Sequence, residues 1–125
     1  MDEKKAIEWY QKALNEGNAV AAFALGEIYR VGNHVVEPNP HQAFKYFLVS
    51  AKRGYPLAQV STGLCLEWGE GVEMDTRAAF GWYKESASAG IAHGLYRLGL
   101  CYEFGVGTDK HAEKAFNCFL KASTD

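Results

Sequence analysis

Glycines recur through this sequence at a nearly constant interval, and this repetition constrains the fold more than any other feature. In three sets of glycines the first interval is 37 residues and the second is 36: Gly17, Gly54 and Gly90; Gly26, Gly63 and Gly99; Gly32, Gly69 and Gly105. Alanines keep the same intervals at Ala6, Ala43, Ala79 and Ala115. A fixed period of this length indicates stacked copies of one structural unit, each of which buries its apolar face against its neighbours.

Each unit is predicted to contain two helices. Apolar residues at i, i+3, i+4 and i+7 favour first helices near 19–31, 56–68 and 92–104. The same pattern favours second helices near 40–53, 75–89 and 110–124, and a lone second helix near 3–16. No segment has the alternation of a strand. We therefore expect an all-α, right-handed superhelix (solenoid) of about three and a half helix hairpins with seven helices. It forms one repeat domain, divided as 1–17, 18–54, 55–90 and 91–125.

The ends of the predicted helices carry the expected capping residues. Asn39 precedes Pro40 as an N-cap, and Asp75 and Asp109 are candidate N-caps of the two later second helices. The first and third glycine sets suit the left-handed position that ends a helix. The glycines at 26, 63 and 99 fall inside helices, where each costs about 1 kcal/mol relative to alanine. We expect them to face the recurring alanines, so that the two backbones of a hairpin approach closely and aromatic neighbours close over the gap.

Composition and charge exclude several classes of partner. The chain of 125 residues has 13 Lys and Arg against 15 Asp and Glu, a net charge of −2, so neither nucleic acid nor a membrane is an expected partner. No apolar run approaches the roughly 20 residues of a membrane span, and the N-terminus is charged, which favours a cytoplasmic protein. Cys65, Cys101 and Cys118 lack the close pairing of zinc ligands, and we expect them to be reduced core residues.

The repeated motifs resemble those of the Sel-one-like repeat (SLR) family, a relative of the tetratricopeptide repeat. They are Leu98-Gly99-x-x-Tyr102-x-x-Gly105-x-Gly107 followed by Lys114-Ala115, the segment Trp82-Tyr83-Lys84, and Lys5-Ala6-x-x-Trp9-Tyr10. The middle copy departs from the pattern at Thr62 and Leu66, and the first copy lacks the Gly-x-Gly loop. The resemblance implies a non-catalytic scaffold or adaptor that binds a peptide or a partner protein.

One branch of that family is cysteine-rich. A resemblance to this branch would imply penicillin binding and weak β-lactamase activity. The positions where its disulfide cysteines would fall here are Ala22, Ala51, Gln59, Ala87 and Leu95. None is cysteine, so the enzymatic branch is the weaker interpretation. The array also begins with a second helix and has no polar capping element, which leaves self-assembly through its uncapped ends as a further alternative.

By analogy with tetratricopeptide arrays, one face of the first helices lines a concave groove. Residues one, four and five after each mid-helix glycine share that face, and these candidate partner-binding residues are Glu27, Arg30, Val31, Leu64, Glu67, Trp68, Leu100, Glu103 and Phe104. Aromatic and acidic side chains together suit a peptide or helix with apolar anchors and basic residues. The alternative is that Val31, Trp68 and Phe104 cover the loops at the helix ends as internal packing.

No catalytic, cofactor-binding or metal site is predicted. The Gly-x-Gly loops lack the preceding strand and the third glycine or lysine of a nucleotide-binding loop, so they are interpreted as turns. His34 and His41 could approach each other across the loop that joins the helices predicted near 19–31 and 40–53. Without a third ligand or a carboxylate nearby we expect both to be exposed side chains. The serines show no nucleophile and base arrangement.

Overall fold

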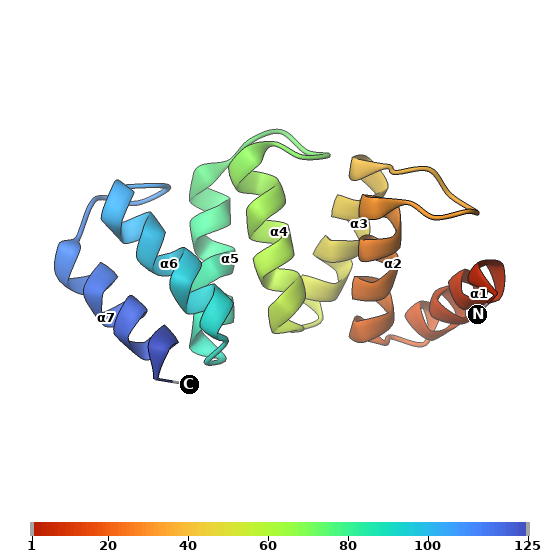
Figure 1. The fold of residues 1–125 in the computed structure, drawn as a ribbon, viewed down its shortest axis with the longest axis horizontal. Helices are drawn as coiled ribbons and strands as arrows, with labels where there is room; N and C mark the ends of the chain where they lie inside the picture. The colour runs from red at the N-terminus through yellow and green to blue at the C-terminus, as the bar shows by residue number, and fades with distance from the viewer. Residues whose placement is uncertain (1, 125) are drawn as a thin grey trace.

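The structure, a computed structural model, describes residues 2–124, and within them it contains seven α-helices and no strand (Figure 1). The helices are α1 (Glu3–Asn15), α2 (Ala19–Val31), α3 (Pro40–Lys52), α4 (Pro56–Trp68), α5 (Thr76–Ser88), α6 (Ala92–Phe104) and α7 (Ala112–Ser123). The predicted ranges of α2, α4 and α6 agree with these bounds, and the four other helices begin or end one or two residues inside theirs.

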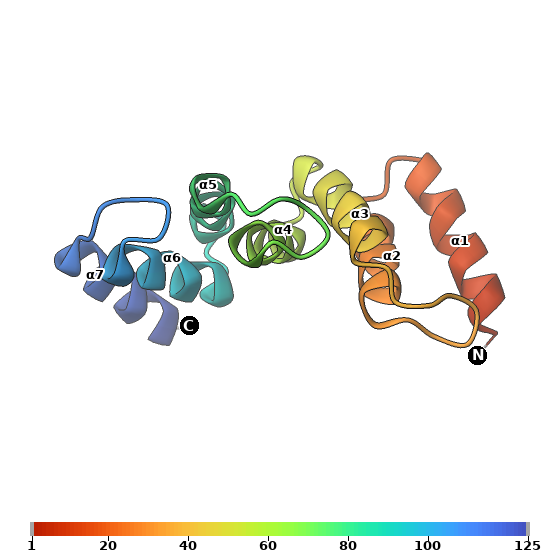
Figure 2. The same cartoon turned by 90° about the horizontal axis from the view of Figure 1, so that it is seen from above.

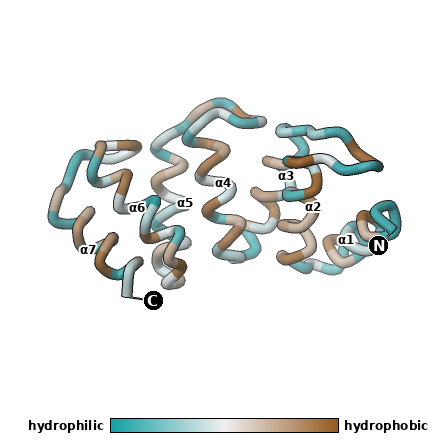
Figure 3. The backbone as a smooth tube through the Cα atoms, in the orientation of Figure 1, coloured by the Kyte–Doolittle hydropathy of each residue, from teal (hydrophilic) through white to brown (hydrophobic). Residues whose placement is uncertain are grey.

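The helices form an array in which each one contacts its neighbours in the chain. The hairpins are α2–α3, α4–α5 and α6–α7, and they are joined by packing of α3 on α4 and of α5 on α6. Seen from above, α2, α4 and α6 follow one side of the array, α3 and α5 lie on the other, and α1 crosses the N-terminal end (Figure 2). Hydrophobic stretches recur within α2 to α7, whereas the start of α1 is hydrophilic (Figure 3). The expected all-α solenoid is confirmed.

The mid-helix glycines receive aromatic rings from the second helix of the same hairpin, as expected. A Cβ atom built on Gly26 would lie 2.5 Å from the ring of Phe47, and one built on Gly63 would lie 2.5 Å from the ring of Tyr83. The ring of Phe119 lies over Gly99 in the same way. Because glycine has no side chain, it leaves a recess in the surface of its helix, and the flat ring packs into that recess. Phe47 and Tyr83 are consequently 0% exposed.

The N-caps of the second helices are set by their register in the repeat. The side chains of Asn39 and Asp75 accept hydrogen bonds from backbone N–H groups three residues later, as expected. The expected cap at Asp109 is wrong, because His111 is the N-cap of α7 and its Nδ1 accepts the N–H of Lys114. The backbone N–H of each N-cap donates to the preceding helix, and for His111 the acceptor is the carbonyl of Tyr102, at 2.8 Å. This tie places the helix start four residues before the recurring alanine.

The loops between the helices of the second and third hairpins lie against the helix that precedes each hairpin. A Cβ atom on Gly71 would collide with the carbonyl oxygen of Pro40, and one on Gly107 would collide with the carbonyl oxygen of Thr76. Both glycines have positive φ angles, of 74° and 69°. The second glycine of the Gly-x-Gly motif therefore lets the loop backbone touch the first turn of the preceding second helix.

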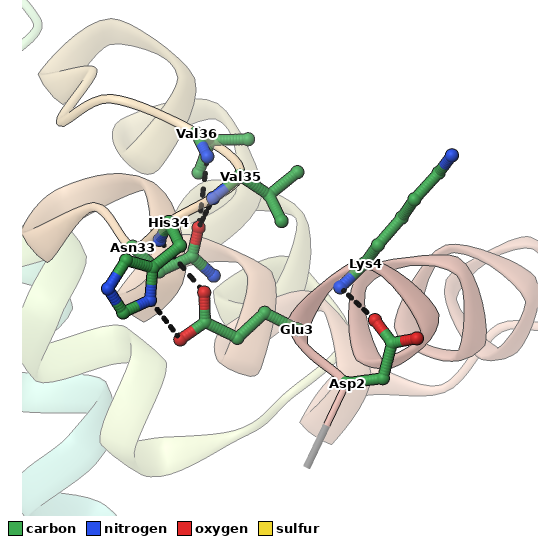
Figure 4. Close-up of polar contacts among 7 residues, drawn as sticks. All are labelled: Asp2, Glu3, Lys4, Asn33, His34, Val35 and Val36. Atoms are coloured by element: carbon green, nitrogen blue, oxygen red, sulfur yellow. Dashed lines mark hydrogen bonds and ion pairs between the residues drawn. The ribbon is translucent and has the colours of Figure 1, made fainter.

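In the first hairpin His34 stands where the other loops have that glycine, and the contact is made differently. The Glu3 carboxylate accepts the backbone N–H of His34 at 2.8 Å and lies 3.2 Å from its Nδ1 (Figure 4). The side chain of Asn33 accepts the N–H groups of Val35 and Val36, which shapes the rest of the loop. The hydrogen bond from the His34 backbone lowers the pKa of Glu3. The extra residue of the first repeat is thus accommodated in this loop, as expected.

Thr62 carries a buried hydroxyl without a partner. It stands in the register of Leu25 and Leu98, is 0% exposed, and its Oγ1 accepts or donates no hydrogen bond within the described residues.

We expect Thr62→Val to raise the free energy of unfolding by about 1 kcal/mol, because it removes an unpaired buried hydroxyl and keeps the shape of the side chain. Chemical denaturation measures this change. Thr62→Ser, which keeps the hydroxyl and loses the methyl group, is the control and should destabilise; a valine variant that also destabilises would contradict the prediction.

Candidate functional site

The nine candidate partner-binding residues lie on the side of the array formed by α2, α4 and α6. Val31, Trp68 and Phe104, the last residues of these helices, are 61%, 63% and 64% exposed. We refer to these three side chains as the apolar row. Their exposure contradicts the alternative that they are internal packing over the helix ends. Leu64 and Leu100 are half-buried beside them.

The charged candidates divide into two kinds. The guanidinium of Arg30 donates two hydrogen bonds to the carboxylate of Glu27, at 3.0 and 3.3 Å, and this contact raises the pKa of Arg30. Glu67 accepts the hydroxyl of the buried Tyr83 at 2.7 Å. Burial, followed by this bond, raises the pKa of Tyr83 far above its usual range. Glu67 therefore supports the core of the second hairpin, whereas Glu103 is exposed and, within residues 2–124, forms no ion pair.

A pocket of about 250 Å³ opens between α2 and α4 and brings three of the candidates together. Glu27, Arg30 and Leu64 line it, and Phe47 and Cys65 form part of its wall. Its remaining lining residues, Ser61 and Glu70, were not predicted. Glu70 stands between the glycines of the second loop, and its place in a connecting turn gave no sign that it would reach this surface. Trp68, Leu100, Glu103 and Phe104 do not line this pocket.

A second hollow, of about 360 Å³, is formed by α5, α6 and α7, and sequence reasoning missed it entirely. Lys84, Lys114 and Lys121 line it around an apolar wall that includes Tyr102. The available signal was a break in the repeat, since Cys118 occupies the register of Trp9, Tyr46 and Trp82. A missing side chain is harder to recognise in a sequence than a motif that is present.

The histidines and cysteines make separate contacts. His41 Nδ1 lies 3.3 Å from the carbonyl oxygen of Gly71, whereas His34 contacts Glu3. In the part of the chain that the structure describes, no three His, Cys, Asp or Glu side chains are arranged to hold a metal ion. The three cysteines are buried and free, and burial raises the pKa of Cys65 to about 11 and that of Cys101 to about 12. These thiols are therefore protonated at neutral pH.

Among residues 2–124, no helix has the length and apolar character needed to cross a bilayer.

Comparison with known families assigns the repeat. The family model described as Sel1 repeat matches residues 2–18, 19–55, 56–91 and 92–124. The chain belongs to the Sel1 repeat family. This confirms the resemblance to Sel-one-like repeats, and it places the chain among proteins that typically serve as scaffolds for protein interaction.

The chain is similar to a curated plant protein and to solved bacterial structures. An F-box protein of Arabidopsis thaliana is 36% identical over 72 residues, which are 58% of this chain and 20% of that protein. A protective antigen of uropathogenic Escherichia coli with an SLR fold superposes with a TM-score of 0.89 at 27% identity, covering 94% of this chain and 25% of its own. A Sel1 repeat protein from Oxalobacter formigenes gives 0.90 at 26% identity, covering 98% and 35%. The chain thus spans between a fifth and about a third of these relatives.

The Helicobacter pylori cysteine-rich protein B has the same repeat fold with a less close superposition. Its TM-score is 0.73 at 25% identity, and the alignment covers 97% of this chain and 86% of that one. In the present chain the three cysteines lie at other positions than those expected for the disulfides of the cysteine-rich branch, and all three are free. The feature that the two chains share is therefore the backbone fold.

Proposed function

We propose that this Sel1 repeat chain is a non-catalytic binding module that holds a peptide or a segment of a partner protein along the apolar row. The observation that supports this most strongly is the exposure of Val31, Trp68 and Phe104 at equivalent positions of three successive repeats. Large apolar side chains exposed in a regular row are unfavourable in water unless another surface covers them. Tryptophan and phenylalanine are also the side chains that most often anchor a protein interface.

The charge near the apolar row favours a partner with basic residues. Glu103 precedes Phe104 and is exposed, and Glu70 lines the pocket between α2 and α4. Glu27 is neutralised by Arg30, and Glu67 is engaged by Tyr83, so neither contributes a fully available charge. We propose that the partner combines apolar anchors for the row with lysine or arginine beside them.

We predict that Trp68→Ala weakens partner binding by about tenfold or more, because truncation of a central aromatic anchor commonly costs at least 2 kcal/mol. The measurement is affinity capture from lysate followed by titration of the captured protein. Trp9→Ala is the matched control, since Trp9 on α1 is 77% exposed and lies outside the row. Glu67→Lys is not suitable as a groove variant, because it would also break the hydrogen bond to Tyr83. Equal binding by wild type, Trp68→Ala and Trp9→Ala would refute the proposal.

Self-association is a second candidate function, favoured by an exposed apolar surface on α7. Phe116 and Leu120 lie one turn apart on this helix and are 63% and 51% exposed. A residue pair of this kind can pack against its counterpart in another copy. A molar mass that rises with protein concentration would support this function, and a constant monomer mass would exclude it.

A further inference from the structure

One position of the repeat carries an aromatic side chain in every second helix except the last. Trp9 in α1, Tyr46 in α3 and Trp82 in α5 stand three residues after the recurring alanine, and Cys118 takes that position in α7. Tyr46 stacks on Tyr29 of the preceding helix, with ring centroids 5.5 Å apart and planes inclined by 21°. Trp82 packs partly buried against the central core cluster. In the first two hairpins, an aromatic side chain therefore stands at this position and packs against the interior of the array.

In the third hairpin no aromatic side chain stands at this position, and a hollow lies beside it. Tyr102 has the register of Tyr29, but opposite it stands the small Cys118 instead of a ring. The result is the pocket of about 360 Å³ between α5, α6 and α7, a size typical of ligand-binding sites. Leu98, which lines this pocket, is 8% exposed, whereas its equivalents Leu25 and Thr62 are 0% exposed.

The walls of this hollow carry positive charge that the corresponding places in the other hairpins lack. At the equivalent positions of the two earlier repeats no residue is basic. These residues are Leu48 and Gln11 for Lys84, Ala78 and Gln42 for Lys114, and Glu85 and Val49 for Lys121. Within residues 2–124 none of the three lysines forms an ion pair. The ammonium of Lys114 lies 5.5 Å from the centroid of the Tyr102 ring, at the side of the opening. We call this hollow the lysine pocket.

We propose that the lysine pocket docks an acidic segment of a partner protein, which inserts an aromatic side chain where the repeat lacks one. The inserted ring would occupy the place of Trp82 in the preceding hairpin and lie on Tyr102 as Tyr46 lies on Tyr29. Carboxylates on either side of the ring would pair with Lys84, Lys114 and Lys121, which gives charge complementarity around an apolar anchor. The lysine pocket shares no residue with the apolar row, so this docking site is independent of the function proposed above.

The test uses the whole chain and a short peptide in which one tryptophan is flanked on both sides by glutamates, with calorimetry as the readout. We expect saturable binding that weakens as salt is raised. A peptide with alanine for tryptophan, and one with lysines for the glutamates, should each bind at least about tenfold more weakly. Equal binding of the three peptides would overturn the proposal. So would binding of indole-3-acetate as tight as that of the peptide, which would assign the pocket to a small aromatic acid.

Variants of the pocket separate its shape from its charge. Cys118→Trp restores the ring of the earlier repeats, and it should reduce peptide affinity at least about tenfold with a melting temperature that is unchanged or higher. The double variant Lys114→Glu with Lys121→Glu alters exposed residues only and should reduce affinity similarly. Its matched control is Lys4→Glu with Lys52→Glu, which changes two exposed lysines outside the pocket. If the pocket double variant binds like this control, or if Cys118→Trp folds and binds like the wild type, the proposal fails.

Discussion

Gly63→Leu is expected to lower the melting temperature by roughly 10 °C, because overpacking a core position of this kind costs about 3 kcal/mol in a domain of this size. A Cβ atom at Gly63 would lie 2.5 Å from Cε1 and 2.8 Å from Cδ1 of Tyr83. The ring cannot turn aside easily, since it is completely buried and its hydroxyl is bound to Glu67 at 2.7 Å. The extra side chain must therefore separate α4 from α5, and both helices contribute to the central core cluster.

Thermal unfolding followed by circular dichroism measures this effect, and a second helical glycine provides the control. Gly81 lies in α5, and a Cβ atom there would meet no atom within 4 Å. Gly81→Ala should therefore stabilise the chain by about 0.5–1 kcal/mol through helix propensity alone. The two variants are predicted to move the melting temperature in opposite directions. If Gly63→Leu melts at the wild-type temperature, the ring of Tyr83 does not depend on a glycine beneath it.

The regular part of the fold could be predicted from the sequence because several signals marked the same boundaries. The helix that became α4 begins with Pro56 at its first position and ends before Gly69, whose φ of 68° is left-handed. The start of α7 has only one such signal, and the sequence predicts Asp109 as the cap because aspartate is a strong N-cap. In the structure the hydrogen bond from His111 to Tyr102 decides where that helix starts. The hydrogen bond between the helices therefore had more influence on the helix start than the capping preference of aspartate. Such a contact cannot be inferred from the residues around the helix start alone.

The surface of the array was predictable only in part. Helical spacing placed Trp68 and Phe104 on one face, and their exposure distinguishes a surface from internal packing. The same spacing placed Glu67 there, but it could not show that Tyr83, sixteen residues later, would donate its hydroxyl to that carboxylate. The lysine pocket depends on what three helices leave unfilled. That property belongs to the packed molecule, and a residue pattern indicates it only when the repeats are compared position by position.

Gly107→Ala is expected to destabilise the junction between the second and third hairpins by about 2–4 kcal/mol. Two costs combine at this position. The φ angle of 69° is left-handed and costs an alanine about 1–2 kcal/mol. The added Cβ would also collide with the carbonyl oxygen of Thr76 in the first turn of α5, and backbone cannot yield as a flexible side chain does. The loop must therefore move away from α5. Faster amide hydrogen exchange around residues 105–111, together with a lower melting temperature, measures both consequences.

Gly90→Ala separates the two costs, because Gly90 has a φ of 78° and a Cβ atom there would meet no atom within 4 Å. It should lose about 1–2 kcal/mol from backbone strain alone, and the excess loss in Gly107→Ala measures the collision. Equal losses would mean that the loop can accept a side chain against α5. The first hairpin shows why a collision is expected instead. Its loop has His34 at this register without a positive φ, and it reaches α1 through the Glu3 carboxylate rather than by direct backbone contact. A side chain is thus tolerated where the connection between hairpins is made by hydrogen bonds, and excluded where two backbones touch.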